Sequence, residues 1–489
     1  MSGTVCTADR LASEAGVAML HRGGNAVDAA LAANAVLSVT APHLCGMGGD
    51  LFALVHDGSV KALNASGRAG SGASASDLRR EGSHVMPRFG DIRSVPVPGC
   101  VDGWLALHSS YSKLPLEQLL APAILLAEQG FPPSPLLEPR LPDVPLEMVG
   151  GLVLRPGVAR TLRAISAEGR DGFYGGEFGR GLLELGQGEY DESDLERSNA
   201  DWVEPLAVDA FGHRVWSMPP NSQGYLLLLA LGIVDGLDLP DDPDDPLWAH
   251  LLIEASRAAG YDRPELLHEH AVAPLEDVTR RRAMVDPSTR MDVRSLGSPG
   301  GTTYLCAVDG DGLGVSLIQS NALGFGSQLW EPRTGINLQN RGIGFSLEEG
   351  HPAEYGPGRR PPHTLVPAIV SRPDGSLRTV IGSMGGDAQP QILLQLLTRL
   401  LRHGQDAATV IGAPRWRLAT EGSGFDTWQS PVHVALEAGT PWAEGLSSKG
   451  HDVRFAPYSG AFGHAQLIDV EAGAAADPRT LIGAATALA

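Results

Sequence analysis

The chain has 489 residues, of which 43% are hydrophobic and 19% are charged, and its formal net charge is −20. This length suits one large domain or two or three average ones, and the negative charge argues against a nucleic-acid phosphate surface, which needs a basic patch. None of the four cysteines forms a C-x-x-C pair, which disfavours a disulfide scaffold or a zinc site. The N-terminus lacks a signal-peptide pattern and no apolar run is long enough to span a bilayer, so we expect a cytoplasmic protein that does not contact membranes.

Hydrophobic periodicity and turn residues predict a mixed chain of helices and strands. Gly23-Gly24 end the first predicted helix, and Asn25 can cap the second with Asp28 three residues on. The elements predicted in chain order are helices over 11–22, 26–39, 104–110, 116–129, 223–232, 248–259 and 390–402, and strands over 51–55, 60–63, 302–308, 314–319, 368–372 and 377–381, with a strand-rich stretch over 202–218.

A Pro-Gly-Gly segment leads directly into Thr302 and Thr303, which open a strand-like run. A threonine that follows a cleavable glycine can become a new N-terminus, with its hydroxyl as nucleophile and its own α-amino group as base. The alternative is an ordinary glycine turn before a strand, in which threonine simply favours β structure. These residues alone favour the ordinary turn.

Gly385 and Gly386 lie at a predicted strand-to-helix turn, where successive N–H groups can form an oxyanion hole; a tight turn that needs small residues is the alternative. Ser383 is a poor nucleophile candidate because the segment lacks the G-x-S-x-G pattern. Arg68 follows a strand, and a solvated side chain is its plain interpretation. The segment 268–270, His-Glu-His, is predicted to be solvated rather than metal-binding, since no third ligand is near it in the sequence.

In their order along the chain, these segments resemble the γ-glutamyltransferase family of N-terminal-nucleophile hydrolases. The resemblance covers nearly the whole chain and depends on segments 11–30, 94–99, 120–123, 302–303, 360–361, 385–386, 413–415 and 477–479. It implies an α+β fold, a four-layer αββα sandwich, in a single-chain precursor that cuts itself between Gly301 and Thr302. The products would be a large subunit, 1–301, and a small subunit, 302–489, paired as an αβ heterodimer or an (αβ)2 assembly.

The resemblance also implies roles for individual residues. Thr302 would be the nucleophile, and Gly385 and Gly386 would hold the oxyanion. Thr303 and Ser320 would hydrogen-bond around the nucleophile.

The remaining roles concern the substrate. Asn321 is the alternative to Ser320 for the hydrogen bond around the nucleophile. Arg68 would bind the substrate carboxylate, since a guanidinium pairs with a carboxylate bidentately. No cofactor or metal is implied.

Two departures from the family pattern bear on the substrate. The acidic residue that binds the γ-glutamyl α-amino group should fall in 337–346, where this chain has Ile343 or Gly344, and the family's Ser-Ser pair is replaced by His363-Thr364. A substrate ammonium would thus lack its counter-charge. We therefore expect a small acyl donor with a carboxylate but no free α-amino group, such as an oxamate-like, oxalyl or dicarboxylic monoacyl compound.

The leading hypothesis is a self-processing threonine amidohydrolase for such a donor. Three alternatives stay open: a C–C hydrolase that acts next to a carbonyl in secondary metabolism, a γ-glutamyl hydrolase or transpeptidase, and an uncut homologue that only binds ligands.

Overall fold

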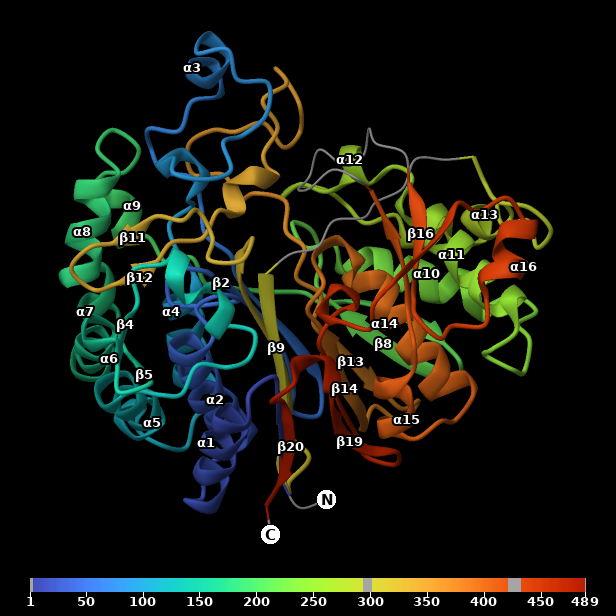
Figure 1. Ribbon diagram of the computed structural model, residues 1–489, viewed down its shortest axis with the longest axis horizontal. Helices are drawn as coiled ribbons and strands as arrows, with labels where there is room; N and C mark the ends of the chain where they lie inside the picture. Colours follow the sequence, from blue (N-terminus) through green and yellow to red (C-terminus); the bar gives the residue numbers. More distant parts are fainter. Residues whose placement is uncertain (1–2, 293–300, 421–431, 489) are drawn as a thin grey trace.

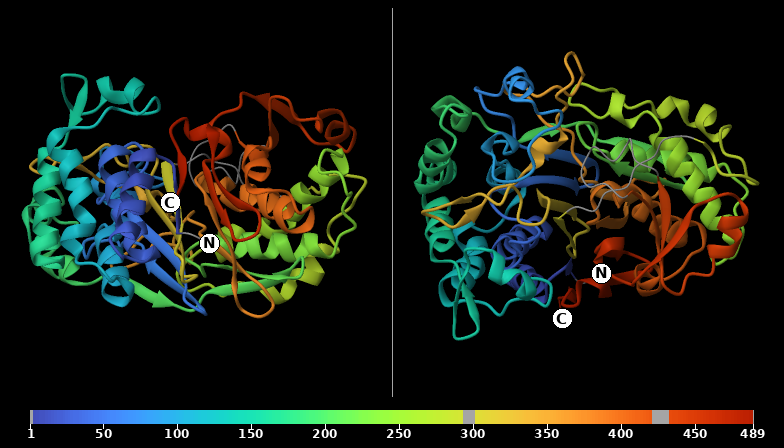
Figure 2. Two further views of the ribbon diagram at one scale, coloured as in Figure 1. Left: turned by 90° about the horizontal axis from the view of Figure 1, so that it is seen from below. Right: turned by 45° about the horizontal axis from the view of Figure 1, so that its top comes forward.

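In the computed structural model, which describes residues 3–292, 301–420 and 432–488, two antiparallel sheets pack face to face. A layer of helices covers the outer face of each sheet (Figure 1). Both views in Figure 2 keep the two helical layers on opposite sides of the strands. This architecture confirms the predicted four-layer αββα sandwich.

The first sheet combines strands from both ends of the chain in the order β20-β1-β9-β10-β2-β3-β6. All its neighbouring strands are antiparallel. β9, which begins at Gly301, therefore lies between a strand from the N-terminal part of the chain and its own hairpin partner. The strands are β1 (Thr4–Thr7), β2 (Asp50–His56), β3 (Val60–Ala65), β6 (Asp201–Val203), β9 (Gly301–Val308), β10 (Gly314–Ala322) and β20 (Ala484–Ala487).

The second sheet has the order β19-β18-β14-β13-β8-β7. Its strands are β7 (Leu206–Ala210), β8 (His213–Ser217), β13 (Ala368–Ser371), β14 (Leu377–Ser383), β18 (Ala465–Asp469) and β19 (Gly473–Ala476). The layer between the two sheets is apolar and includes Phe52, Tyr304, Ile318, Ile369 and Val380. Burial of such side chains stabilises the contact between the sheets by about 1.5–3 kcal/mol each.

The helices of the two outer layers bury separate cores. One layer packs on the first sheet and consists of α1 (Arg10–His21), α2 (Ala26–Thr40), α4 (Cys100–Tyr111), α5 (Leu116–Gln129) and α6 (Pro156–Glu168). The other packs on the second sheet and contains α10 (Gly224–Asp235), α11 (Pro246–Gly260) and α14 (Gln389–Leu397). The smaller elements are α3 (Ala75–Arg80), α7 (Arg170–Tyr174), α8 (Glu177–Leu185), α9 (Glu192–Glu196), α12 (Arg263–Leu266), α13 (Val278–Arg282), α15 (Ala407–Gly412), α16 (Ala443–Ser448), β4 (Glu147–Val149), β5 (Leu152–Leu154), β11 (Trp330–Glu331), β12 (Ile336–Asn337), β15 (Trp416–Ala419), β16 (His433–Glu437) and β17 (Val453–Ala456).

Local sequence signals account for several element boundaries. Asn25 caps α2 as predicted, in a capping box with Asp28. Gly23 follows α1 with a φ of +86°, a conformation that favours glycine. The predicted helix over 390–402 is α-helical only to Leu397, and Thr398–Arg402 continues it as a π-helix.

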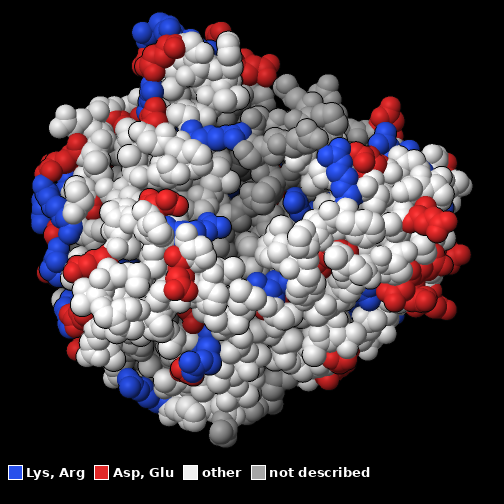
Figure 3. All heavy atoms as spheres, in the orientation of Figure 1, with Lys and Arg blue, Asp and Glu red and all other residues white. Residues whose placement is uncertain are grey.

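An acidic loop lies on the surface between two helices of the second layer. The loop 238–245 between α10 and α11 contains Asp241, Asp242 and Asp244, which are exposed, and Figure 3 shows acidic side chains gathered at this edge of the molecule. Among the helices of the described ranges, none combines the length and the apolar character needed to cross a bilayer.

Candidate functional site

Thr302 lies at the start of β9, on the face of its sheet that packs against the second sheet. Side chains alternate along a strand, so Thr302 shares this face with Tyr304 of the apolar layer between the sheets. Ile318 of β10 lies opposite Tyr304, and Ser320 lies opposite Asp50 of β2. Three polar side chains, those of Thr302, Ser320 and Asp50, are therefore buried at one end of this layer.

Hydrogen bonds connect the Thr302 hydroxyl to the peptide that precedes it. Thr302 Oγ1 lies 3.1 Å from Ser320 Oγ, and the Ser320 hydroxyl donates to the Gly301 carbonyl at 2.6 Å. Ser320 Oγ also accepts from the Ala322 N–H at 2.8 Å and from Arg341 Nη2 at 3.2 Å. A hydroxyl has one proton and two lone pairs. Because the Thr302 hydroxyl and these two N–H groups all donate to Ser320 Oγ, the single Ser320 proton is directed at the Gly301 carbonyl, which it polarises.

A β-bulge shapes this end of the hairpin. The register of β9 and β10 shifts between Gln319 and Ala322, and Ala322 has a φ of +74°. A Cβ on Gly301 would lie 2.5 Å from the backbone nitrogen of Gly324. Glycine before Thr302 is therefore required by a close backbone approach.

Gly385 and Gly386 follow the end of β14 in the second sheet. A Cβ on Gly382 would lie 2.2 Å from the Tyr304 ring, so the end of β14 crosses β9 two residues away from the candidate nucleophile. Gly385 and Gly386 have φ values of +145° and +57°, which favour glycine. Within the described residues neither of their N–H groups has a hydrogen-bond acceptor. The turn thus provides the two free donors that an oxyanion hole needs.

Asp50 and His363 form a buried pair next to this site. Asp50 Oδ1 accepts from the Gly67 N–H and from Gln339 Nε2, both at 2.8 Å, and Asp50 Oδ2 lies 3.2 Å from His363 Nε2. Burial, with the nearby Arg341 charge, lowers the pKa of His363 to about 3. The imidazole is therefore neutral at pH 7, and its Nε2–H donates to the Asp50 carboxylate.

Two buried arginines complete the polar site. Arg341 Nη1 donates to Thr364 Oγ1 at 3.1 Å, while Arg263 Nη2 pairs with Asp387 Oδ1 at 2.7 Å. Burial lowers the pKa of Arg341 to about 10, so its guanidinium remains a cation at pH 7. A hydroxyl nucleophile, a polarised carbonyl, two free N–H groups and a buried cation together suit acyl transfer.

Comparison with known proteins agrees with this site chemistry. The family model described as Gamma-glutamyltranspeptidase matches residues 12–487. The chain belongs to the gamma-glutamyltranspeptidase family. Its curated relatives in this family are enzymes, and the chain is accordingly an enzyme.

Members of the gamma-glutamyltranspeptidase family resemble the chain over most of its length. The oxamate amidohydrolase proenzyme of Klebsiella pneumoniae is 35% identical over 95% of this chain and 94% of its own length. The glutathione hydrolase-like YwrD proenzyme of Bacillus subtilis is 34% identical over 83% of each chain. A cephalosporin acylase from Bacillus halodurans has a crystal structure that matches with a TM-score of 0.88 and 32% identity, covering 99% of this chain and 95% of that one.

Arg68, the carboxylate-binding candidate taken from the gamma-glutamyltranspeptidase family, already has two acidic partners. Its Nη2 lies 3.1 Å from Asp201 Oδ2, and its Nη1 lies 3.8 Å from Glu269 Oε2. Glu269 also pairs with Arg359 at 3.1 Å and its side chain is only 11% exposed. The prediction of a solvated segment 268–270 is therefore wrong for Glu269, which is held by nearby arginines that the sequence did not place beside it.

Two other predicted residues point away from Thr302. Thr303 lies on the opposite face of β9, and its Oγ1 has no hydrogen-bond partner within the described chain, so the predicted hydrogen bond to the nucleophile is not formed. The Asn321 amide donates to the Pro42 carbonyl at 3.4 Å, in the loop between α2 and β2. Ser320, not Asn321, therefore adjoins the candidate nucleophile.

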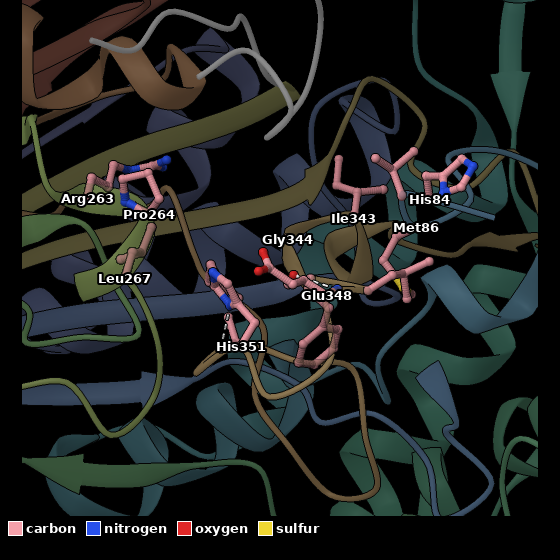
Figure 4. Close-up of a pocket in the computed structure, with 15 residues that line it drawn as sticks. His84, Met86, Arg263, Pro264, Leu267, Ile343, Gly344, Glu348 and His351 are labelled. Atoms are coloured by element: carbon pink, nitrogen blue, oxygen red, sulfur yellow. Dashed lines mark hydrogen bonds between the residues drawn. The ribbon is translucent and has the colours of Figure 1, made fainter. Parts of the chain in front are cut away.

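A cavity of about 320 Å³ opens beside the site. Ile343 and Gly344, which follow Arg341, line one part of it, and Arg263 and Pro264 line another (Figure 4). Its remaining lining combines apolar side chains, among them Met86, Leu267 and Phe345, with the polar side chains of His84, Ser346, Glu348 and His351. The positions where an acidic residue was expected, Ile343 and Gly344, carry no carboxylate, and Glu348 lines the same cavity.

Within the described residues, one group could hold a metal ion: His250 and Glu254 of α11 with His451. His250 Nε2 donates to the Asp286 carbonyl at 2.8 Å, so its Nδ1 accepts from His451 Nε2, also at 2.8 Å. Glu254 lies 3.3 Å from the Arg257 guanidinium. Hydrogen bonds and an ion pair already engage all three side chains, and they belong to the helical layer outside the second sheet.

Sequence reasoning missed Asp50 and Arg341. An aspartate that opens the apolar strand 51–55 was a usable signal for a buried carboxylate, because a lone charge in such a run needs partners. Arg341 gave no such signal, since its burial depends on contacts with Ser320 and Thr364 that the sequence does not reveal.

Proposed function

We propose that the chain is a self-processing threonine amidohydrolase, cut between Gly301 and Thr302, that hydrolyses an amide of a small carboxylic acid. The observation that carries the proposal is the set of hydrogen bonds that links Thr302 Oγ1, Ser320 Oγ and the Gly301 carbonyl. The printed names of relatives, an oxamate amidohydrolase proenzyme and acylase proenzymes, support it.

In self-cleavage, Thr302 Oγ1 attacks the Gly301 carbonyl carbon. The developing charge on the Gly301 oxygen accepts a stronger hydrogen bond from Ser320, which itself is held by Ala322 and Arg341. The Thr302 hydroxyl proton is transferred to the departing nitrogen as the C–N bond breaks, which leaves an ester on Oγ1 and a free α-amino group on Thr302. Water then hydrolyses the ester. The resulting chains, 1–301 and 302–489, would stay associated because β9 remains paired with β1 on one side.

In catalysis, the freed α-amino group accepts the Thr302 hydroxyl proton as Oγ1 attacks the substrate carbonyl. An unperturbed α-amine has a pKa of about 7.7–8.0, so a usable fraction is neutral at pH 7. The N–H groups of Gly385 and Gly386 hold the oxyanion. Ammonia or an amine leaves with a proton, and water releases the acid from the Thr302 ester.

The composition of the site favours a donor that lacks an α-ammonium group. The turn Arg341–Gly344 contains no acidic residue, and the cavity wall it forms is apolar apart from the backbone. An ammonium group buried against this turn would find no counter-charge on the turn itself, and the carboxylate that lines the same cavity is that of Glu348.

The experiment is to trap the acyl-enzyme. Purified mature protein is mixed with oxamate or another dicarboxylic monoamide, quenched in acid and digested. We expect the peptide that begins at Thr302 to gain the mass of the acyl group. Unmodified Thr302 and no ammonia release across the whole panel of monoamides would contradict the proposal.

A further inference from the structure

Arg341 is a buried cation that makes no direct ion pair with a carboxylate within the described residues. We propose that its guanidinium binds the carboxylate of the acyl donor, and that it selects oxalyl-type donors, in which the carboxylate is bonded directly to the scissile carbonyl. This inference rests on the proposed amidohydrolase function. It assigns binding of the substrate carboxylate to Arg341 instead of Arg68.

The hydrogen bonds of Arg341 leave capacity for an anion. Its side chain is 2% exposed, and within the described residues no carboxylate oxygen lies within 4.0 Å of it. Of its five N–H donors, one contacts Ser320, one contacts Thr364, and Nε has no partner. A desolvated guanidinium held by two neutral hydroxyls is a strong site for a carboxylate.

The nearest acidic side chains, Asp50 and Asp387, act on the Arg341 charge only through space, because their oxygens bond other groups. Asp50 is bound by backbone N–H groups, Gln339 and His363, and Asp387 is bound by Arg263. Arg68, by contrast, has Asp201 and Glu269 beside it and would have to exchange these for a substrate. Arg341 can therefore bind a substrate carboxylate without giving up a direct ion pair, whereas Arg68 cannot.

Distance sets the length of the donor. Arg341 Nη2 is one hydrogen bond from Ser320 Oγ, which is one hydrogen bond from Thr302 Oγ1. A carbonyl carbon in position for attack lies about 3–3.5 Å from the nucleophile, and a carboxylate oxygen lies about 2.7–2.9 Å from a guanidinium nitrogen. Together, these two contact lengths account for nearly all of the separation between Thr302 Oγ1 and Arg341 Nη2, which two hydrogen bonds through Ser320 Oγ bridge. Only a carboxylate close to the carbonyl can make both, whereas a glutaryl chain places its carboxylate too far away.

The same cation assists the chemistry of an oxalyl donor. Attack on its amide creates an oxyanion on the carbon that already bears the carboxylate. Two adjacent negative charges repel strongly in a buried site. The Arg341 charge next to them lowers that repulsion, while the Gly385 and Gly386 N–H groups hold the oxyanion.

The test measures binding of free dicarboxylates to mature enzyme by calorimetry. We expect affinity to fall in the order oxalate, malonate, succinate and glutarate. Arg341→Gln keeps N–H donors for Ser320 and Thr364 but removes the charge, and we expect it to weaken oxalate binding roughly 10- to 150-fold, as loss of a charged hydrogen bond implies. We expect Arg341→Lys to give an intermediate loss, and Arg68→Gln to change oxalate affinity less than about threefold.

Two results would overturn the assignment: tightest binding of glutarate by the wild-type enzyme, or loss of oxalate binding in Arg68→Gln with retention in Arg341→Gln. If Arg341→Gln stays uncut or unfolds, as shown by intact mass and thermal melting, the chain-length series on wild-type enzyme alone decides. Failure of the amidohydrolase proposal can be distinguished from failure of this assignment. In the first case Thr302 would not be acylated in the trapping experiment, whereas dicarboxylate binding could still be measured.

Discussion

Replacement of Ser320 by alanine tests how the precursor cuts itself. The Ser320 hydroxyl donates to the Gly301 carbonyl at 2.6 Å, and in Ser320→Ala that carbonyl loses this donor as its charge develops. Removal of one such donor typically costs roughly 2.7–4 kcal/mol of transition-state stabilisation, which corresponds to about 10²–10³ in rate. We therefore expect self-cleavage of Ser320→Ala to be slower than that of the wild type by this factor.

The assay follows freshly translated precursor over time by gel electrophoresis and intact mass. Ser316→Ala is the matched control: Ser316 is a buried serine on the same face of β10, but its hydroxyl contacts Tyr304 and the Ile381 carbonyl. Both variants should lose a similar stability, about 1 kcal/mol, yet only Ser320→Ala should cleave slowly. Cleavage of Ser320→Ala at the wild-type rate, or equal slowing in both variants, would refute the reasoning.

Three further predictions follow from the packing and charges. Gly301→Ala should slow or block cleavage, because its Cβ would lie 2.5 Å from the Gly324 nitrogen; normal processing, seen by intact mass, would contradict this. Gly382→Ala should destabilise the fold by about 1–3 kcal/mol, because its Cβ would lie 2.2 Å from the Tyr304 ring; urea unfolding at pH 7 measures the loss, and unchanged stability would show that the sheets can separate there at no cost. His363 has a folded-state pKa of about 3, below its usual 6.5, so the unfolded chain binds more protons between these values, and the free energy of unfolding should fall as pH drops through this window. The decrease should be smaller in His363→Gln, and identical pH slopes for the two proteins would remove His363 as its source.

The sequence predicted the elements around the site well, because their signals are local. Asn25 and Gly23 mark helix boundaries through capping and positive φ. The hairpin that begins with Thr302 follows from a short continuous apolar run and a tight turn at Asp309. The assembly of these elements into two stacked sheets came from the family resemblance, since strand order joins segments far apart in the chain.

The site itself was predictable only in part. Ser320 reaches Thr302 because Gln319 pairs with Thr303 in the hairpin, and this strand register, like the β-bulge that follows it, has no local signal in the sequence. Thr303 was assigned a place next to the nucleophile, but strand alternation turns it to the opposite face. The sequence alone does not distinguish Arg68 from Arg341. Their contacts do, because Arg68 pairs directly with a carboxylate and Arg341 donates to hydroxyl groups.

The most direct test of the account is the intact mass of the purified protein beside that of Thr302→Ala. The account predicts two fragments, 1–301 and 302–489, from the wild type and a single uncut chain from the variant. One uncut chain from both proteins under conditions that allow maturation, or a cut at any other position, would contradict the assignment of Thr302 as the nucleophile.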